Sequence, residues 1–439
     1  MGATAQHKTI RPGYKLTEVG VIPVEWFDQP CAEVCVKIQD GTHFSPSLGG
    51  NDYLYVTSKN IGFGYLDVSN ADRVDTTQHK AIYKRCDVRQ GDLLLTKDGA
   101  NTGNAALNTL EEEFSLLSSV AFLRFDAKRH VAGYFLQQIL SNPGQNRIKD
   151  AMAGNAITRL TLEKIRKLRF PVAPVPEQHA IAGVLHDVDE LIDVLDKLTA
   201  KKRDLKRAVM QELLTGKRRL PGFARAKAGF KQTEVGAIPD EWAVKRLGDL
   251  FEVTSSKRVF QSEWRTQGVP FYRARELAVL GEFGSVNNEL FITQKMYDAF
   301  KRAYGVPNVG DMLVTGVGTL GKVYVVTDER EFYFKDGNII WFKIAGTVAP
   351  EFLRQLYLTP LITKQISDGS GGTTVGTYTI TGAKKTVIPF PPLPEQTAIA
   401  AVLSDMDADI AALEARRIKA QAMKQGMMQQ LLTGNIRLI

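Results

Sequence analysis

Two long stretches of the chain carry apolar residues at alternating spacings of three and four positions, the pattern of an amphipathic helix. They run from Glu177 to Leu214 and from Glu395 to Leu432. Each begins at a Pro-Glu-Gln sequence and ends at Leu-Leu-Thr-Gly, which predicts Gly216 and Gly434 as C-terminal caps. At about 1.5 Å per residue, each helix would be roughly 55 Å long.

A one-sided apolar stripe of that length is unfavourable in water, so pairing of the two helices within the chain is the simplest arrangement. The same stripes offer positions where a partner could dock. The residues expected in helix pairing or partner docking are Ile181, Val184, Val188, Leu191, Leu195, Leu198, Leu205, Ile399, Val402, Met406, Ile410, Leu413, Met423 and Met427.

The segments outside these helices read as mixed α/β. Short apolar or alternating runs bounded by Gly, Asn and Asp predict strands, and two apolar segments predict short helices. The expected strands are Asp92–Thr96, Ser119–Phe125, Met312–Val314, Val323–Val326 and Asn338–Phe342, and the expected helices are Gly133–Leu140 and Pro350–Leu358.

The chain is internally duplicated. Residues 14–26 (YKLTEVGVIPVEW) and 230–242 (FKQTEVGAIPDEW) share nine of thirteen positions, and residues 174–220 share 23 of 47 positions with residues 392–438. Between these edges GDLLLT at Gly91 matches GDMLVT at Gly310. The offset stays between 216 and 219, so a single duplication of a domain and a helix covers nearly the whole chain. The interiors match poorly, which would suit two sites for different ligands, or neutral drift between the copies.

Composition narrows the class of protein. The 439 residues are 44% hydrophobic and 24% charged, with three cysteines, Cys31, Cys35 and Cys86. This is the balance of a globular protein. Three cysteines cannot form a disulfide framework, so buried thiols in a reducing cytoplasm are expected. Neither a membrane span nor a signal peptide is expected from the hydropathy pattern.

The positive charge is concentrated in one segment. The formal net charge is +8, and residues 197–231 alone hold twelve Lys or Arg against two Asp or Glu. Such a run attracts a phosphate backbone, although a solvated helix face is the alternative interpretation.

The motifs usually associated with catalysis are incomplete. GVGTLGK, from Gly316 to Lys322, satisfies two phosphate-binding patterns but continues into a strand-like run and lacks the hydroxyl residue that Mg²⁺ requires. It predicts a glycine-rich hairpin loop. The six histidines are scattered, no methyltransferase signature is present, and neither catalytic nor metal-ligating residues can be nominated.

The ordered, duplicated motifs TEVG-x-IP-x-EW, GD(L/M)L(L/V)T, P-x-PEQ-x-AIA-x-VL and LLTG-x-x-RL resemble the DNA-specificity subunit of type I restriction–modification systems. The resemblance spans about residues 14–438. It implies an internally duplicated α/β (α+β) chain with two mixed α/β target-recognition domains separated by two long antiparallel coiled-coil helices. The corresponding segments are an N-terminal segment (1–26), recognition domain 1 (27–173), the central helix (174–216), a basic linker (217–242), recognition domain 2 (243–391) and the C-terminal helix (392–434).

The resemblance also implies the partners. They are double-stranded DNA, two methyltransferase subunits, and motor–nuclease subunits bound through them. S-adenosylmethionine, ATP and Mg²⁺ are expected on those subunits, with no cofactor on this chain. The expected target is bipartite and asymmetric, because two domains on paired helices can read half-sites about one helical turn apart. Similar loops in the family lie near DNA at 155–158 and 370–377.

Base readout requires polar side chains on loops that reach a groove. The candidates, chosen for residue type and loop context, are Lys37, Thr42, His43, Ser58, Lys59, Asn60, Lys97, Asn101, Asn104 and Arg159 in the first domain, and Ser255, Ser256, Lys257, Arg258, Arg273, Arg275, Lys322, Thr373, Thr374 and Tyr378 in the second. The alternatives are the specificity subunit of a methylation-only or type II-like system, a coiled-coil scaffold that does not bind DNA, and an enzyme that uses the Gly316 loop.

Overall fold

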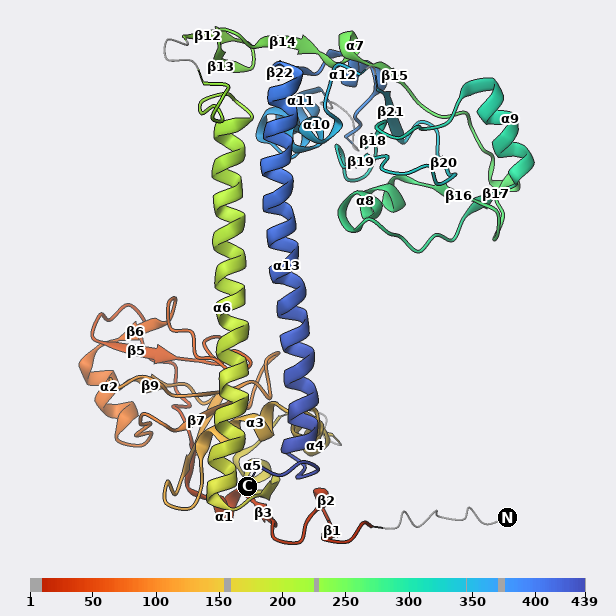
Figure 1. Cartoon of the computed structure of the whole chain (residues 1–439). Helices are drawn as coiled ribbons and strands as arrows, with labels where there is room; N and C mark the ends of the chain where they lie inside the picture. Colours follow the sequence, from red (N-terminus) through yellow and green to blue (C-terminus); the bar gives the residue numbers. More distant parts are fainter. Residues whose placement is uncertain (1–9, 154–158, 225–228, 345, 370–375, 439) are drawn as a thin grey trace, which may run out of the picture. The chain divides into compact units, whose positions relative to one another are not determined.

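The structure is a computed structural model that describes residues 10–153, 159–224, 229–344, 346–369 and 376–438. It divides into two compact units, Met1–Asp196 with Ala415–Ile439 (unit 1) and Lys197–Glu414 (unit 2). Each unit therefore combines one domain with parts of both long helices (Figure 1). The compact units divide within the helices, whereas the six segments expected from the sequence remain a prediction.

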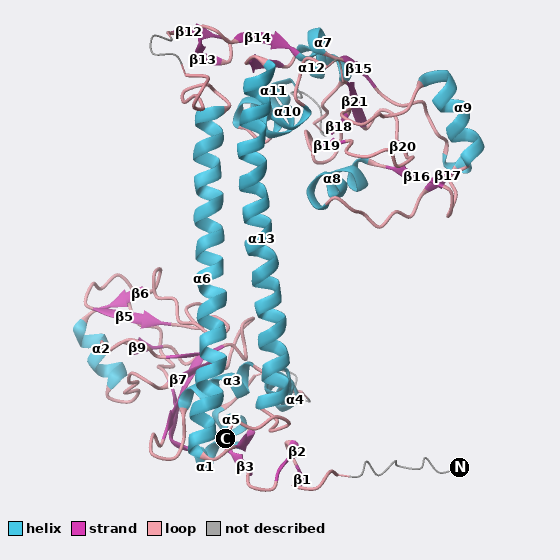
Figure 2. Ribbon diagram, viewed as in Figure 1, coloured by secondary structure: helices cyan, strands magenta, loops and turns pink. Residues whose placement is uncertain are grey.

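The first half of the chain contains eleven named strands and six named helices among its described residues (Figure 2). They are β1 (Tyr14–Thr17), β2 (Gly20–Pro23), β3 (Phe27–Pro30), α1 (Cys31–Val34), β4 (Cys35–Asp40), β5 (Tyr53–Val56), β6 (Asp72–Val74), α2 (Thr76–Tyr83), β7 (Leu93–Thr96), β8 (Ala105–Leu107), β9 (Ser115–Leu116), β10 (Val120–Phe125), α3 (Ala132–Leu140), α4 (Asn142–Met152), α5 (Leu162–Lys167), β11 (Arg169–Val172) and α6 (Val175–Leu213).

The second half repeats this order with changes in the domain interior. Its elements are β12 (Phe230–Thr233), β13 (Gly236–Pro239), β14 (Ala243–Arg246), α7 (Leu247–Leu250), β15 (Glu252–Thr254), the 3₁₀ turn η1 (Gln261–Glu263), β16 (Val269–Tyr272), α8 (Ala274–Phe283), β17 (Phe291–Ile292), α9 (Gln294–Tyr304), β18 (Met312–Thr315), β19 (Val323–Val325), β20 (Tyr333–Phe334), β21 (Ile339–Lys343), α10 (Pro350–Tyr357), α11 (Pro360–Gly369), α12 (Ile380–Lys385), β22 (Val387–Phe390) and α13 (Leu393–Leu431).

The central sheet is the same in both copies. Its strand order is β4-β10-β7-β8 in unit 1 and β15-β21-β18-β19 in unit 2, and all the neighbouring strands are antiparallel. One face of the unit 1 sheet packs on α3, α4 and α6, and its core includes Leu93, Leu123 and Phe135. The sequence-based strands and short helices are confirmed, and the mixed α/β duplication with them.

The small sheet beside the central one has the same topology in both copies, and the copies differ in the helices around it. In unit 1 β5 is antiparallel to β6 and parallel to β9, and in unit 2 β16 is likewise antiparallel to β17 and parallel to β20. Helix α2 follows β6 and helix α9 follows β17, whereas α8 is an additional helix after β16 of unit 2. The interiors therefore keep one sheet topology despite their poor sequence match, and unit 2 adds α8 to it.

The two long helices are antiparallel within each unit. In unit 1 Lys424 on α13 lies 2.6 Å from Asp189 on α6. Arg417, earlier on α13, pairs with Asp196, later on α6. In unit 2 Lys202 lies 2.9 Å from Asp409, while later Lys206 pairs with earlier Asp407. Residue numbers rise along one helix as they fall along the other, as the resemblance implied.

The seam between the helices is narrower than the sequence predicted. Ile181, Val188 and Leu195 are buried, and so is Leu185, which the predicted stripe left out. On α13 Ile399 and Ile410 are buried, Val402, Met406, Leu413 and Met427 are half-buried, and Met423 is exposed. Val184, Leu191, Leu198 and Leu205 are 37–52% exposed and lie outside the buried seam, so partner docking, the other role expected for them, stays a prediction.

The repeated motifs meet in one buried cluster per unit. In unit 1 the indole of Trp26 donates to Glu177 over 3.0 Å, and Arg437 donates to both oxygens of the same carboxylate. In unit 2 Trp242 and Arg219 make the same bonds to Glu395. The EW, PEQ and LLTG-x-x-RL motifs therefore recur because together they join the hairpin to the beginning of one helix and the end of the other.

The helix-terminal glycines cannot be replaced without strain. Gly216 and Gly434 both have a φ of +70°, the left-handed conformation of a C-terminal cap. A Cβ on Gly216 would lie 2.4 Å from Cδ of Pro239, and one on Gly434 would lie 2.5 Å from Cδ of Pro23. The caps are thus confirmed, and each glycine packs on the proline of a repeated IP motif.

Much of the basic run at residues 197–231 is neutralised within the protein. Lys202, Lys206 and Arg203 pair with acidic residues of α13, and Arg219 pairs with Glu395. These four residues are thus held in ion pairs within the chain, and the interpretation of the run as a phosphate-binding tract stays a prediction. Arg225 and Lys227 lie outside the described residues.

The cysteines and the hydropathy pattern match the sequence analysis. Cys31 and Cys86 are buried free thiols, and Cys35 is a partly buried one. Among the residues that the structure describes, none of the helices combines the length and the apolar character that crossing a bilayer would need.

Candidate nucleic-acid interface

One end of the central sheet in unit 1 brings together five of the predicted residues. Thr42 and His43 follow β4, and Lys97 follows β7, on either side of the beginning of β10. The backbone NH of Leu160 donates to the carbonyl of Lys97, which places Arg159 beside it. The backbone NH of Ser58 donates to the hydroxyl of Ser119 in the turn before β10.

Ionisable side chains link these loops in series. His43 lies 3.2 Å from Asp40, and the buried Lys97 lies 3.5 Å from Asp40 and 3.0 Å from Asp98. Arg159 then lies 2.9 Å from Asp98 and remains 60% exposed. Burial raises the pKa of Asp98, but hydrogen bonds from Arg159 and Lys97 outweigh burial and hold that pKa below its usual value. The cluster is preorganised, with His43 and Arg159 at its two exposed ends.

Other predicted residues of the first domain stabilise the loops themselves. Asn60 is buried, accepts from the backbone NH of Thr57 and donates to the carbonyl of Asp67. The side chain of Asn104 donates to the carbonyl of Ile61. These bonds give both residues a structural role in their loops, and a direct base contact by either of them stays a prediction. Lys59 and Asn101 are exposed and stay candidates.

Lys37 does not belong to this cluster. It lies within β4 opposite Arg124, three pairs from Asp40, and its ammonium group pairs with Asp87. Arg124 pairs with Asp87 and Asp92. This network lies towards the other end of the sheet, so we assign Lys37 a structural role.

The equivalent end of the unit 2 sheet carries different groups. The hydroxyl of Ser255 donates to the carbonyl of Ile339, and that of Ser256 donates to the carbonyl of Phe334. The backbone NH of Lys257 donates to the hydroxyl of Tyr333. Arg258 pairs with Asp336 at 2.9 Å and is 67% exposed. The two serines hold the loop, while Lys257 and Arg258 are presented by it.

Two further arginines are gathered at the beginning of α8. Arg273 lies 2.7 Å and Arg275 3.0 Å from the buried carboxylate of Glu276. Burial raises the pKa of Glu276, but hydrogen bonds from Arg273 and Arg275 outweigh burial and lower it. Arg275 is the more exposed of the two, so it is the better placed to reach a ligand.

The remaining candidates of the second domain are elsewhere. Lys322 lines a cavity of about 620 Å³ formed with α8, α10 and α13. Tyr378 is buried, and its hydroxyl lies 3.1 Å from that of Tyr357 and 2.8 Å from that of Thr386. Predicting a base contact for Tyr378 was wrong, because it belongs to the core. Thr373, Thr374 and residues 155–158 lie outside the described residues.

Equivalent positions in the two copies carry different chemistry. In the sheet register Gln39 pairs with Phe122 as Thr254 pairs with Trp341, so Asp40 corresponds to Ser255, and Lys97 corresponds to Gly316 at the offset of 219. The backbone supports this match, because Gly316 accepts a hydrogen bond from the NH of Tyr378 as Lys97 does from Leu160. The same scaffold thus presents a charged cluster in unit 1 and a polar loop with an exposed arginine in unit 2.

The sequence analysis missed the acidic residues of the unit 1 cluster. Asp40 and Asp98 were passed over because base readout favours cations and amides. Asp40 ends β4 and Asp98 follows β7, and each aspartate precedes a glycine, in QDG and KDG. That pattern marks a turn at a strand end and could have placed both residues at one edge of the sheet.

The glycine-rich motif has no nucleotide-binding geometry. Gly316–Lys322 connects β18 to its antiparallel neighbour β19, so a strand follows where a phosphate-binding loop needs a helix. The hairpin prediction is confirmed. Within the described part of the chain, no group of three or more His, Cys, Asp or Glu side chains could hold a metal ion.

A duplicated scaffold with two different polar surfaces defines a recognition protein with two sites. Residues 51–201 and 239–422 match the family described as type I restriction modification DNA specificity domain. The chain belongs to this family. The specificity-subunit interpretation is confirmed, and with it the absence of a catalytic role, whereas the scaffold and nucleotide-enzyme alternatives are not supported.

Similar proteins agree over almost the whole length. A candidate specificity subunit of the type I restriction enzyme MjaX from Methanocaldococcus jannaschii is 25% identical, over 97% of this chain and 96% of that protein. The type I restriction enzyme MjaVIII specificity subunit from the same organism is 25% identical, over 82% of each. The S subunit of a type I restriction–modification system from M. genitalium has the same fold, with a TM-score of 0.57 and 15% identity over 95% of this chain and 97% of that one.

Proposed function

We propose that this chain reads a bipartite, asymmetric DNA target, with one half-site for each recognition domain. The proposal rests on one observation. The same scaffold occurs twice in the chain, and its two copies present different hydrogen-bond donors at the same end of the central sheet. Arg159 is an exposed end of the unit 1 cluster, and Arg258 is an exposed cation on the loop after β15 of unit 2. Two unlike surfaces on copies of one fold would read two unlike half-sites.

The exposed stripe of α6 supports docking of methyltransferase subunits. Val184, Leu191 and Val194 are 37–57% exposed in unit 1, and Leu198 and Leu205 are 39–52% exposed in unit 2. These apolar side chains lie beside the buried seam and are not covered by α13. An apolar stripe of this kind fits a partner helix. We assign it to two methyltransferase subunits, through which motor–nuclease subunits would join.

The partner subunits would then carry out the catalytic steps. S-adenosylmethionine would sit on the methyltransferase subunits, and ATP with Mg²⁺ on the motor–nuclease subunits. The support from this chain is the hairpin geometry of the Gly316 loop, which cannot cradle a phosphate. Because its target is cellular DNA, we place the complex in the cytoplasm.

Binding-site selection on random duplex DNA tests the proposal. The chain assembled with its methyltransferase subunits should enrich two specified blocks of different sequence, separated by unspecified bases. Enrichment of a single continuous block, or of no sequence, would contradict it. The methylation-only alternative is distinguished by adding the motor–nuclease subunits, since only a restriction complex cleaves unmodified DNA.

A further inference from the structure

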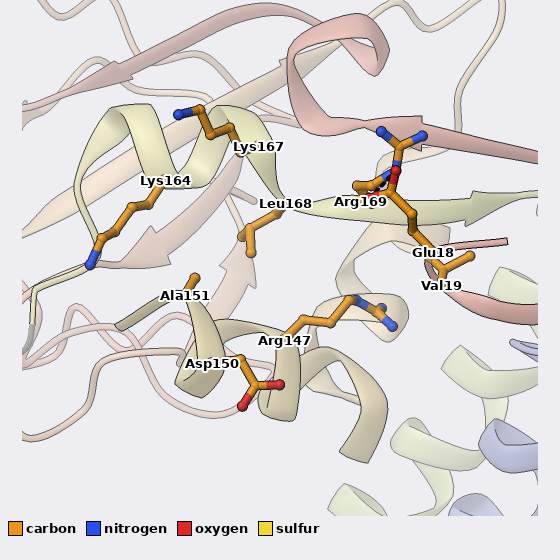
Figure 3. A pocket seen from close by; sticks show the side chains of 9 residues that line it. All are labelled: Glu18, Val19, Arg147, Asp150, Ala151, Lys164, Lys167, Leu168 and Arg169. Atoms are coloured by element: carbon orange, nitrogen blue, oxygen red, sulfur yellow. Dashed lines mark ion pairs between the residues drawn. The ribbon is translucent and has the colours of Figure 1, made fainter. Parts of the chain in front are cut away.

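Unit 1 contains a cavity that the proposed DNA surface does not use. It has a volume of about 340 Å³ and lies between the β1–β2 turn, α4, α5 and β11. Four cationic side chains line it, together with two carboxylates and three apolar side chains (Figure 3). The lining residues are Glu18, Val19, Arg147, Asp150, Ala151, Lys164, Lys167, Leu168 and Arg169.

Arg147 is the side chain in this cavity that has a buried donor atom without a hydrogen-bond partner in the described part of the chain. Its side chain extends from α4 towards the turn that carries Glu18 and Val19 (Figure 3). The Nη2 atom is buried and has no hydrogen-bond partner among the described residues. Burial lowers the pKa of Arg147 and outweighs the opposite influence of Asp28 and Tyr134, so the charged guanidinium is only partly compensated. A buried charge that is incompletely compensated is unfavourable, which makes an anion at this place stabilising.

The neighbouring cations are already paired or directed outward. Arg169 lies 2.8 Å from Asp28, and Glu18 points towards Arg169 at 3.6 Å (Figure 3). Lys167 pairs with Glu163 at 2.7 Å. These ion pairs engage Arg169 and Lys167 with other carboxylates and leave Nη2 of Arg147 without a partner among the residues that the structure describes.

In the second copy, uncharged residues occupy the positions equivalent to Arg147 and Arg169. Arg147 corresponds to Gln365 at the offset of 218, and Arg169 corresponds to Val387. Gln365 donates to the carbonyl of Val387 over 2.9 Å and accepts from its backbone NH over 2.9 Å. The side-chain amide of Gln365 thus has both a donor and an acceptor partner on strand β22. At the same offset Lys164 corresponds to Gly382. Three of the four cations are therefore particular to unit 1.

We propose that this cavity is a binding site for a small oxyanion, phosphate or carboxylate, held by the guanidinium of Arg147. Arginine suits this role because its fixed fork of donors matches two oxygens of such a group. Asp150 and Glu18 at the edge of the cavity disfavour a DNA backbone and favour a small free anion. The site is independent of the proposed DNA reading.

Titration calorimetry of the full chain tests the proposal, with inorganic phosphate and acetate in separate arms at constant ionic strength. One or both should bind, and the arms show whether a tetrahedral or a planar anion is preferred. Arg147→Gln should weaken binding tenfold or more. This variant should fold, because Gln365 occupies the equivalent position in the second copy. Lys149→Gln, an equal charge change on the exposed face of α4, should leave binding within twofold.

Hydrogen exchange of the full chain gives a second readout with an internal control. The anion should protect peptides from residues 142–153 and 162–172 but not those from residues 360–369 and 380–390. Absence of binding by both anions would overturn the site, as would equal losses in the two variants. If Arg147→Gln weakened only duplex DNA binding, the anion would be a DNA phosphate and the proposal would be wrong.

Discussion

At the scale of single residues, the exposed arginines of the candidate interface form ion pairs with acidic residues of their own domain. Arg159 is held by Asp98, Arg258 by Asp336, and Arg275 by Glu276. A DNA contact would therefore exchange one charge-assisted hydrogen bond for another. Such an exchange adds little affinity, but it fixes the side chain in advance and so favours discrimination between sequences.

Arg159→Gln should relax recognition in one half-site only. Loss of an arginine that reads a base costs about 1–3 kcal/mol, so we expect binding to weaken about tenfold or more. Arg258→Gln should do the same for the other half-site. Fluorescence anisotropy with duplexes mutated in each block measures the effect. Equal weakening on every duplex would show phosphate contacts instead of base contacts.

Asp87 should make unit 1 sensitive to acid. Burial raises its pKa, but hydrogen bonds from Lys37 and Arg124 outweigh burial and lower the pKa to about 2. Because the folded pKa lies below the unfolded one, this stabilisation is present above pH 4 and is lost as the pH falls towards 2. Partial exposure of the carboxylate limits the effect to about 1 kcal/mol.

Denaturant midpoints of the wild type and of Asp87→Asn, measured by intrinsic fluorescence, test this. The difference in unfolding free energy between the two proteins should shrink as the pH falls from 4 to 2. A difference that stayed constant over this range would show that the ion pairs of Asp87 do not contribute as the structure indicates.

Residue type and loop context predicted where polar groups gather, but not which of them remain available. Thr42, His43, Lys97 and Arg159 do lie together. Asn60, Asn104 and Tyr378 were equally plausible in sequence, yet their polar groups are used by neighbouring parts of the fold. Tertiary hydrogen bonds between distant segments decide this, and a single sequence does not encode them in a local pattern.

At the scale of elements, the two long helices show what periodicity can predict. Their existence, ends and pairing followed from the apolar spacing and the capping residues. The periodicity could not decide which face of α6 packs on α13. Val184 and Leu185 both lie one turn from Ile181 and Val188, and both are apolar. The structure buries Leu185 and exposes Val184. Two adjacent apolar stripes therefore serve two purposes, with one in the intramolecular seam and one on the surface.

The two stripes should respond differently to charge. Leu195 is 4% exposed and Leu191 is 41% exposed, and both belong to unit 1. Leu195→Asp would bury an unpaired carboxylate and should destabilise the chain by several kcal/mol. Leu191→Asp should leave the unfolding midpoint nearly unchanged and should weaken assembly with the methyltransferase.

Chemical unfolding followed by size exclusion with light scattering separates these effects. The midpoint reports on the seam, and the mass of the complex reports on docking. A Leu191→Asp protein that assembles with wild-type affinity would show that the exposed stripe of α6 is not a docking surface.

At the scale of the whole molecule, each compact unit is made of two stretches that are distant in sequence. Unit 1 takes residues from 415 onward at the end of the chain, including Met428, Leu431 and Arg437. The duplication places the same residue types at Met210, Leu213 and Arg219, which serve unit 2. The first half of the chain therefore contains a copy of the segment that its own domain needs.

A fragment of residues 1–220 should consequently form a symmetric dimer. In it, residues 197–220 of each protomer would take the place of residues 415–438 in the other. The exposed apolar surface of an unpaired helix, at roughly 25 cal/mol per Å², drives this association. Two identical domains should then select an inverted repeat. Light scattering and binding-site selection test the dimer, and a soluble monomer or a non-palindromic site would contradict it.

The central claim is that two unlike surfaces on one duplicated scaffold read two unlike half-sites. Sequencing of methylated adenines in a cell that carries this chain and its methyltransferase tests it most directly. We predict one motif with two specified blocks of different sequence, divided by an unspecified spacer of constant length. A palindromic or continuous motif, or methylation that does not change when this chain is removed, would contradict the claim.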